Sequence, residues 1–322
     1  MKAKADRQFS VKNKSLVLTL DPSTGPRIFL LSAMLILMLV SCTRRFTAPA
    51  SALDDDSVDN AYKLIWSDEF NIDGPPNEEN WNYEIGFIRN EEAQYYQPEN
   101  AFCENGNLII EARREPRVNP IYDPVKTWDW KKVRDTAEYT SACLRTDNKQ
   151  TFQYGRFEMR ARIDTAIGLW PAFWTLGIEG EWPGCGEVDI LEYYRGNFLT
   201  NVCWARKERF RPHWDSERTP ISQFQDSTWA DSFHVWRMDW TPRSIALYMD
   251  DILLNRTALR RTMNRYGPRV NPMQQPHFIL INLAIGGLHG GDPSETSFPR
   301  RMEVDYVRVY QIPDQDTGPR TN

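Results

Sequence analysis

One stretch of the chain, Gly155-Arg156-Phe157-Glu158-Met159-Arg160-Ala161-Arg162-Ile163, alternates apolar and charged side chains from its second residue to its last. The odd-numbered side chains from Phe157 onward are apolar, and the even-numbered ones are charged. An alternation with a period of two residues is typical of a β-strand that buries one face. The stretch therefore predicts a half-buried strand at residues 155–163.

Further strands are predicted on both sides of this one. Short runs rich in Val, Ile, Tyr, Phe and Trp occupy residues 107–112 (NLIIEA), 234–240 (HVWRMDW), 244–249 (SIALYM), 277–284 (HFILINLA) and 303–310 (EVDYVRVY). Asp250 and Asp251, between two of these runs, indicate a hairpin turn. The one candidate helix is short, at residues 258–264. Many short strands separated by turn signals predict an all-β sandwich or jelly roll, which we place at residues 61–313 as a single domain.

Regular alternation in the last run, 303–310, makes a specific prediction about its two faces. Val304, Tyr306 and Arg308 should share one face. The opposite face should hold Glu303, Asp305, Val307 and Val309.

Composition excludes some function classes. The 322 residues carry a formal net charge of −5, whereas a protein that binds a nucleic-acid backbone needs clustered Lys and Arg. The chain contains 12 Trp, 13 Tyr and 15 Phe, and every Trp lies at or beyond Trp66. These rings suit core packing and stacking on sugar rings equally well, so composition alone does not choose between the two.

The first 42 residues are predicted to be an export signal. Residues 28–40 (IFLLSAMLILMLV) form an apolar run that basic residues precede, and the run is shorter than the about 20 residues of a membrane span. It ends at residues 39–42 (LVSC), which resemble the bacterial lipoprotein box with Cys42 as the lipidated residue. The alternative is an ordinary signal peptide with an incidental cysteine.

We therefore expect an exported protein that is lipid-anchored to the bacterial outer membrane, on its periplasmic or cell-surface face. Residues 43–60 would form a flexible tether, and residues 314–322 a disordered tail. The lipid anchor would be the protein's contact with the membrane.

Four further cysteines follow the signal: Cys103, Cys143, Cys185 and Cys203. They allow three disulfide pairings, among which the sequence does not choose. Because no pair has CxxC spacing and the chain has only four scattered His, a zinc site is not expected.

Residues 186–194 (GEVDILEYY) place three carboxylates in a run of strong β propensity. Glu187 and Asp189 are two residues apart and share a strand face. Glu192 lies five residues beyond Glu187, an odd interval that turns it away in a regular strand. One extra residue in a β-bulge, at Ile190 or Leu191, brings it back to the same face.

Three carboxylates on one strand face repel each other, so their pKa values separate and at least one keeps a proton. Glycoside hydrolysis needs one ionised carboxylate that attacks and one protonated carboxyl that donates. Neighbours on one strand face lie about 5 to 7 Å apart, which favours a retaining over an inverting enzyme. The alternatives are a solvated strand face and a calcium site. Tryptophans crowd the segment at 170, 174, 182 and 204, which favours the hydrolase.

At this point the chain resembles glycoside hydrolase family 16, the laminarinase-like retaining endo-glycanases, from about residue 62 to residue 311. Besides residues 186–192, the motifs are residues 66–70 (WSDEF), 90–96 (NEEAQYY), 139–142 (YTSA), 154–158 (YGRFE), 168–174 (GLWPAFW), 275–277 (QPH), 282–287 (NLAIGG) and 304–310 (VDYVRVY). The resemblance implies a concanavalin A-like β-jelly roll of two antiparallel sheets with a glycan cleft on the concave face. It implies that Glu187 is the nucleophile, that Glu192 is the acid/base and that Asp189 tunes their protonation.

The resemblance also implies binding residues. Those for substrate, each with core packing or a structural role as the alternative, are Asn90, Glu91, Trp170, Trp174, Trp182, Trp204, Gln275 and Asn282. Many family members hold a structural Ca²⁺ on the convex side, and the matching positions are Glu69 and Asp305 with a main-chain oxygen near Gly106. Asp305 has two alternatives, a strand cap or a pair with an arginine. No cofactor is expected for catalysis.

Two basic stretches depart from the family's pattern. Residues 199–205 (LTNVCWA) lack the usual His and precede a predicted charged loop at 206–215 (RKERFRPHWD), and residues 116–134 are insertion-like, with Trp128 and Trp130. Such loops suit a sulfated or sialylated glycan, with solvated charged loops as the alternative.

The leading hypothesis is a monomeric retaining endo-β-glycanase whose partner is a polysaccharide, with β-1,3-glucan of the laminarin type as the first candidate. An endo-galactanase on agar, porphyran, carrageenan or mucin-type chains is the second. A transglycosylase and a catalytically inactive glycan-binding protein remain as further alternatives.

Overall fold

The computed structural model describes residues 61–224 and 228–313, which form two β-sheets. The predicted all-β sandwich is therefore confirmed. The predicted signal at 1–42 with Cys42, the tether at 43–60 and the tail at 314–322 lie outside the described residues. Within those residues, no helix combines the length and the apolar composition needed to cross a membrane.

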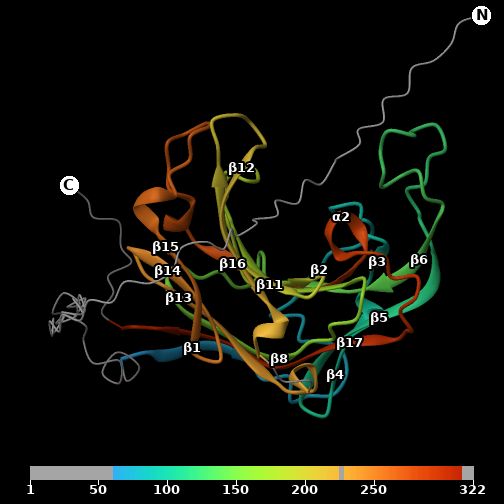
Figure 1. The fold of residues 1–322 in the computed structure, drawn as a ribbon, viewed down its shortest axis with the longest axis horizontal. Coiled ribbons are helices and arrows are strands. Elements are labelled where there is room, and N and C mark those ends of the chain that lie inside the picture. Colours follow the sequence, from blue (N-terminus) through green and yellow to red (C-terminus); the bar gives the residue numbers. More distant parts are fainter. Residues whose placement is uncertain (1–60, 225–227, 314–322) are drawn as a thin grey trace, which may run out of the picture. The chain divides into compact units, whose positions relative to one another are not determined.

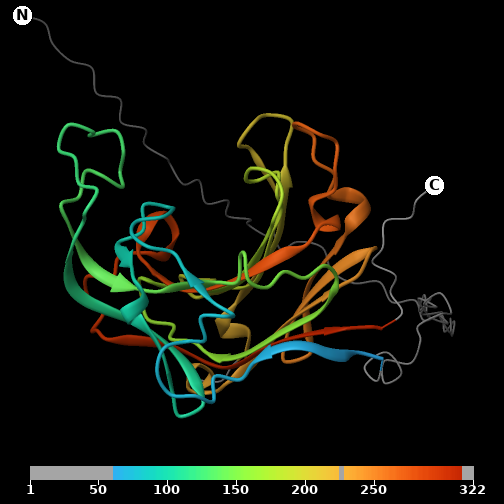
Figure 2. The ribbon, with the colours of Figure 1, turned by 180° about the vertical axis from the view of Figure 1, so that it is seen from behind.

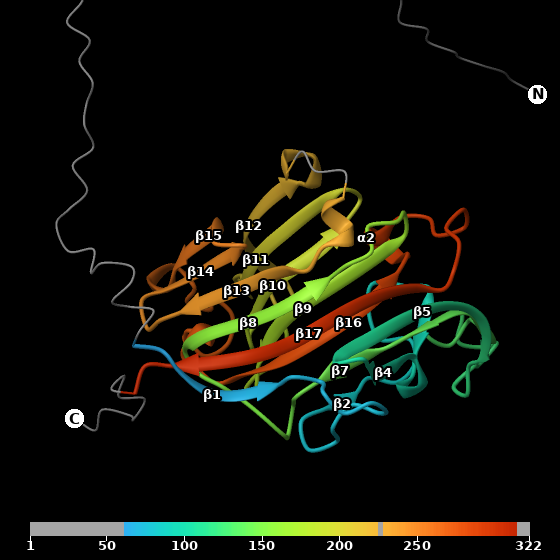
Figure 3. The same ribbon diagram turned by 90° about the horizontal axis from the view of Figure 1, so that it is seen from below.

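The larger sheet has ten strands and forms one layer, seen from below in Figure 3. Its main path runs β15 (Ile252–Ala258), β14 (Ser244–Met249), β13 (His234–Trp240), β8 (Gly155–Arg162), β17 (Arg300–Gln311), β5 (Asn107–Val118), β6 (Thr136–Ser141) and β3 (Gln94–Tyr96). Beside this path, β1 (Lys63–Asp68) pairs with β17, and β4 (Ala101–Glu104) pairs with β5. Neighbouring strands are antiparallel, except for the parallel pair of β3 and β6.

The second sheet has seven strands and carries the candidate site. Its order is β12 (Pro212–Pro220), β11 (Asn197–Ala205), β10 (Glu187–Tyr194), β9 (Leu169–Gly177), β16 (His277–Ile285), β7 (Cys143–Arg145) and β2 (Asn82–Tyr83) (Figure 1). The helical turns are short: η1 (Pro98–Asn100), η2 (Ile221–Phe224), η3 (Trp229–Asp231), η4 (Leu259–Arg261), η5 (Pro272–Gln274) and α2 (Gly287–Gly290).

The predicted alternation of β8 is confirmed, and it places the core between the sheets. Phe157, Met159 and Ala161 are buried, and they share one hydrophobic cluster with Val188 and Leu191 of β10. The charged face of β8 is not simply solvated, because its three arginines form ion pairs with carboxylates of β13 and β17. One face of β8 thus supplies apolar packing, and the other ties three strands together.

The face assignment for β17 was wrong in its second half. Its register against β8 shifts between Val304 and Tyr306, which marks a bulge. The extra residue returns the side chains that follow to the core face, so Val304, Val307 and Val309 are all fully buried. Strict alternation could not predict this, because the residue inserted by a bulge carries no distinctive sequence signal.

Three local predictions had different outcomes. The hairpin turn is confirmed, since Asp250 and Asp251 both have positive φ and join β14 to β15. The candidate helix at 258–264 was wrong beyond the single turn of η4. The charged loop predicted at 206–215 ends early, because β12 begins at Pro212 and pairs along its length with β11.

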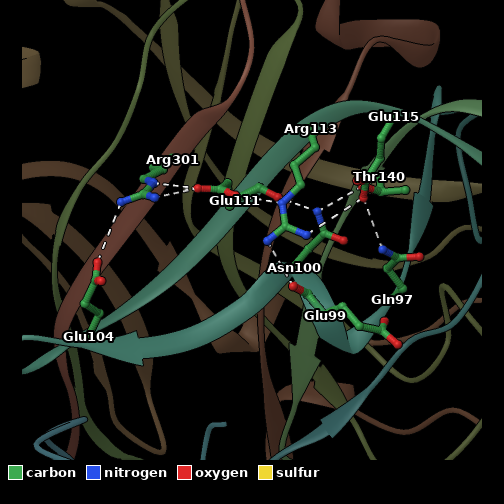
Figure 4. A network of polar contacts seen from close by, with 9 residues as sticks. All are labelled: Gln97, Glu99, Asn100, Glu104, Glu111, Arg113, Glu115, Thr140 and Arg301. Atoms are coloured by element: carbon green, nitrogen blue, oxygen red, sulfur yellow. Dashed lines mark hydrogen bonds and ion pairs between the residues drawn. The ribbon is translucent and has the colours of Figure 1, made fainter. Parts of the chain in front are cut away.

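A polar network holds the region where β4, β5, β6 and β17 meet (Figure 4). Glu111 of β5 accepts hydrogen bonds from Arg113 on its own strand and from Arg301 on β17, each at 2.7 Å. Gln97, which follows β3, donates to Glu115 of β5 at 3.3 Å. These bonds fix the chain directly after β3, and β3 in turn follows the turn at residues 89–92 that reaches the candidate site.

Two connections extend from the sandwich at its opposite ends. The green segment between β5 and β6 projects at one end, and the orange segment that follows β15 lies beside the yellow β11–β12 hairpin at the other (Figures 1 and 2). The first includes the insertion-like stretch with Trp128, whose side chain is 78% exposed.

Candidate active site

The bulge predicted in the carboxylate strand is present. The register of β10 shifts between Asp189 and Glu192 against β11, and between Asp189 and Leu191 against β9. Ile190 and Leu191 are both buried in the core, so the strand gains one residue on that side. Glu187, Asp189 and Glu192 consequently line one cleft on the opposite face.

Hydrogen bonds fix the orientation of all three carboxylates. The indole Nε1 of Trp182 donates to Glu187 at 2.5 Å, and that of Trp170 donates to Glu192 at 3.0 Å. The amide nitrogen of Asn201 donates to both Asp189 at 2.8 Å and Glu192 at 3.0 Å. One amide nitrogen thus holds Asp189 and Glu192 next to each other.

Burial is the largest cause that raises the pKa of each of these carboxyls. For Asp189, the negative charges of Glu187 and Glu192 add to burial and hold the pKa well above its usual range. For Glu192, burial and the charge of Glu187 raise the pKa to about 7. The pKa of Glu187 also rises, although the Trp182 hydrogen bond and the positive charge of Arg89 oppose the effect of burial.

These shifts favour a different protonation state for Glu187 than for Asp189 and Glu192 at mildly acidic pH. Asp189 keeps its proton and donates it in a hydrogen bond to Glu187, which lowers the pKa of Glu187 and favours its ionised form. Glu192 is protonated below a pH of about 7. The strand therefore presents an ionised Glu187 and a protonated Glu192 on one face, which is the pair of states needed for acid-assisted nucleophilic displacement.

The cleft around these carboxylates has a volume of about 720 Å³. Four of the predicted substrate-binding residues line it, namely Asn90, Trp170, Trp174 and Trp182. Trp182 is 40% exposed, whereas Trp170 and Trp174 are buried, and the Arg89 guanidinium lies over the Trp174 ring. The cleft is thus walled by indoles on the side of β9 and the loop before β10.

The other four predicted binding residues do not line the cleft. Glu91 is exposed, and its main-chain oxygen accepts from Arg134. Gln275 bonds the main chain of Glu179 and of Cys185. Asn282 accepts from the Trp174 indole at 2.8 Å and so positions a residue that does line the cleft. Trp204 is buried beside His213 and borders a second cavity instead.

Several cleft residues were not predicted. Among them are Arg89, Asn201, Trp214, Arg218 and His289. Arg89 directly precedes the NEEAQYY motif, so its position was a usable signal. Asn201 lies opposite Asp189 on β11, and only the register of two strands reveals that relationship. His289 belongs to α2 and stacks on Tyr194, which nothing in the local sequence indicates.

The residues at the implied calcium positions do not fit a calcium ion. Glu69 accepts two hydrogen bonds from Arg308, at 2.9 and 2.7 Å, and Asp305 pairs with Arg160 at 2.5 Å. Within residues 61–224 and 228–313, no group of three or more His, Cys, Asp or Glu could hold a metal. Guanidinium groups thus occupy both carboxylates that the ion would need.

All four cysteines of the described chain are buried free thiols: Cys103, Cys143, Cys185 and Cys203. None of the three possible pairings is formed. Burial raises the pKa of each thiol, for Cys103 to about 11 and for Cys185 to about 12. These groups are therefore protonated and poor nucleophiles at neutral pH.

Comparison with known proteins identifies relatives across most of the chain. The model for glycosyl hydrolases family 16 matches residues 92–308. A beta-glucanase from Rhodothermus marinus is 35% identical over 297 residues, covering 87% of this chain and 94% of the relative. The laminarinase structure from the same organism superposes with a TM-score of 0.62 at 35% identity, over 78% of this chain and 97% of that one. Another solved structure comes from work on endo-acting O-glycanases with which human gut microbiota initiate mucin breakdown. It superposes with a TM-score of 0.71 at 30% identity and covers 79% of this chain and 92% of that one.

Proposed function

Because the chain belongs to glycosyl hydrolases family 16 and is an endo-acting glycoside hydrolase, we propose that its substrate is a β-1,3-glucan of the laminarin type, cleaved with retention of configuration. The observation that carries the mechanism is the bulged strand β10, which sets an ionised Glu187 and a protonated Glu192 on one face of the cleft. The beta-glucanase and laminarinase relatives support the choice of glucan.

The geometry gives each carboxyl a distinct role. Glu187 attacks the anomeric carbon and forms a glycosyl-enzyme while Glu192 protonates the departing oxygen. Glu192, now ionised, then removes a proton from water, which attacks the same carbon from the opposite face and frees Glu187. Asp189 donates its hydrogen bond to Glu187 again as the carboxylate leaves, which favours the ionised form of Glu187.

A panel of polysaccharides tests the substrate. We expect the domain of residues 61–313 to release oligosaccharides from laminarin, with intermediate chain lengths first, as endo-cleavage requires, and with the β-anomer formed first. Laminarin, lichenan, agarose, porphyran, carrageenan and mucin would be compared by product chromatography, and the anomer by NMR within the first minutes.

Each contrary outcome has a distinct meaning. Release from agarose, porphyran, carrageenan or mucin but not from laminarin would favour the galactanase alternative, which the O-glycanase neighbour supports. Products longer than the substrate would indicate a transglycosylase. Binding without any product from a correctly folded domain would indicate a glycan-binding protein.

We also propose that the protein is exported and lipid-anchored at Cys42, on the basis of the apolar run and the LVSC sequence that ends it. The variant Cys42→Ala is expected to move the protein from the membrane fraction to the soluble fraction, because it removes the acylated side chain. Fractionation of cells with immunoblotting measures this, and Ser41→Ala serves as the control because it keeps a small residue before Cys42. Wild-type protein that is already soluble would contradict the anchor.

A further inference from the structure

A second cavity adjoins the active-site cleft. It has a volume of about 940 Å³, and its walls come from Trp204 of β11, from the start of β12 and from residues 260–269 after β15. Trp214 lines both this cavity and the cleft. Figures 1 and 2 show the two wall segments side by side at one end of the domain.

Strand register relates the cavity to the catalytic centre. Trp214 of β12 lies opposite Cys203 of β11, and Cys203 lies opposite Glu187 of β10. Trp214 is therefore two strands away from the nucleophile at the same level of the sheet. A glycan chain that occupies the cleft at Glu187 can thus reach the edge strand β12, where the cavity opens beyond Trp214.

The cavity is rich in unpaired cations. Arg260, Arg261, Arg265 and Arg269 line it, and none of them has an ion-pair partner within residues 61–224 and 228–313. No Asp or Glu occurs between residues 252 and 291. The one acidic residue in the wall, Asp215, already accepts a hydrogen bond from the Thr257 hydroxyl at 3.0 Å.

These arginines differ from those of β8. The three arginines of β8 each have a carboxylate partner. The protein as a whole is acidic, with a formal net charge of −5. Burial and the positive charges of Arg206 and Arg265 lower the pKa of His213 in the same wall, so the positive charge of the cavity comes from its arginines. An acidic protein that concentrates unpaired guanidinium groups in one cavity has a site suited to an anion.

We propose that this cavity binds an anionic substituent, a sulfate ester or a sugar carboxylate, on a glycan whose backbone lies in the active-site cleft. Guanidinium groups bind both anions through paired, charge-assisted hydrogen bonds, and the Trp214 ring is placed to contact the sugar that carries the substituent. The three carboxylates of the cleft repel an anion, so the substituent must lie away from the cut bond. The inference rests on the proposed endo-glycanase activity of the cleft, and it makes a glycan with an acidic substituent a better ligand than neutral laminarin.

The test measures binding with hydrolysis disabled. In a Glu187→Gln background, we would titrate oligosaccharides released from gastric mucin, before and after desulfation and, separately, before and after removal of sialic acid, with laminari-oligosaccharides as a neutral reference. We expect removal of the recognised anion to weaken binding about tenfold or more, the effect of losing a charge-assisted hydrogen-bond pair. The two treatments distinguish a sulfate from a carboxylate.

Arginine variants localise the effect. The double variant Arg261→Gln/Arg265→Gln should bind native and anion-stripped oligosaccharides equally, and its affinity for laminari-oligosaccharides should stay within about twofold of the parent. The control double variant Arg243→Gln/Arg256→Gln removes the same two positive charges at arginines outside the cavity wall, and it should keep the full preference.

The proposal is overturned if a folded parent shows no preference for either anion, or if the double variant keeps the preference. Failure of the proposed function is seen separately, as an absence of product from every polysaccharide with Glu187 intact. Binding of acidic oligosaccharides in the Glu187→Gln background would still support the anion site in that case.

Discussion

The variant Glu187→Gln is expected to lose glycan hydrolysis by about four orders of magnitude or more, because no covalent intermediate can form without the nucleophile. The fold should remain, since the glutamine amide has nearly the same shape and its carbonyl can still accept from the Trp182 indole. It also removes a buried ionisable carboxyl whose pKa is raised by burial, so thermal stability at neutral pH should be unchanged or higher.

A rescue experiment separates a nucleophile from a merely structural residue. Glu187→Ala leaves a space on one face of the anomeric carbon, which azide can enter. Azide then forms the bond to carbon, the bond to the leaving oxygen breaks, and Glu192 protonates that oxygen, so the product is an α-glycosyl azide. Glu192→Ala should instead give the β-azide, because azide attacks the glycosyl-enzyme in place of water.

An Asp189 variant assayed with azide provides the comparison for a residue that is not the nucleophile. Asp189→Asn keeps the hydrogen bond from Asn201 only if the new amide turns its oxygen toward it, and it keeps Glu187 in place. It should lower activity without any azide rescue. An unchanged turnover in Glu187→Gln, or an azide product of the same anomer from both Glu variants, would contradict the assigned roles.

The fold and the catalytic strand were predictable because both depend on short-range patterns. Period-two alternation identified β8, and the odd interval between Glu187 and Glu192 required a bulge that β10 indeed contains. The bulge in β17 escaped prediction because the apolar pattern tolerates either face, with valines at both 304 and 307. The bulge in β10 was predictable because a regular strand would have turned the charged Glu192 toward the core, where burial of a charge is unfavourable.

The rest of the site depends on which strands are neighbours. Asn201 donates to Asp189 and Glu192 because β11 pairs with β10. The sequence near a residue does not determine which residue lies opposite it on the neighbouring strand. The ion pair of Glu69 with Arg308 likewise joins positions 239 apart in the chain. The family motif marked Glu69 as a calcium position, but the motif alone did not show where the guanidinium of Arg308 would lie.

Catalysis should depend on pH through Glu192, whose pKa burial and the charge of Glu187 raise to about 7. The group must be protonated to act as the acid, so kcat/KM should fall as the pH rises through about 7. At the acid end, activity should fall as Glu187 becomes protonated, above the usual carboxyl pKa because burial raises it. The wild-type profile is therefore expected to be bell-shaped, with its basic side set by Glu192.

Three variants test this assignment. With a dinitrophenyl glycoside, whose leaving group needs no proton, Glu192→Gln should lose the basic side of the profile. With a polysaccharide, it should lose about 10²- to 10⁴-fold in rate. Trp170→Phe removes the indole hydrogen bond that lowers the pKa of Glu192, so its basic side should move to higher pH. Trp182→Phe removes the corresponding bond to Glu187 and should move the acid side instead.

Stability supplies an independent measurement of the same group. The folded protein holds a proton on Glu192 between the usual carboxyl pKa of 4.5 and about 7, whereas the unfolded chain has released it. The stabilisation linked to this proton is fully present below pH 4.5 and is lost as the pH rises through about 7. Glu192→Gln should therefore raise the melting temperature relative to wild type more at pH 8 than at pH 5. The assignment is contradicted if Glu192→Gln keeps the basic side of the pH–activity profile and if its melting temperature differs from that of wild type equally at pH 5 and pH 8. The titration would then belong to another group, and Asp189 is the candidate because it accepts a hydrogen bond from the same Asn201.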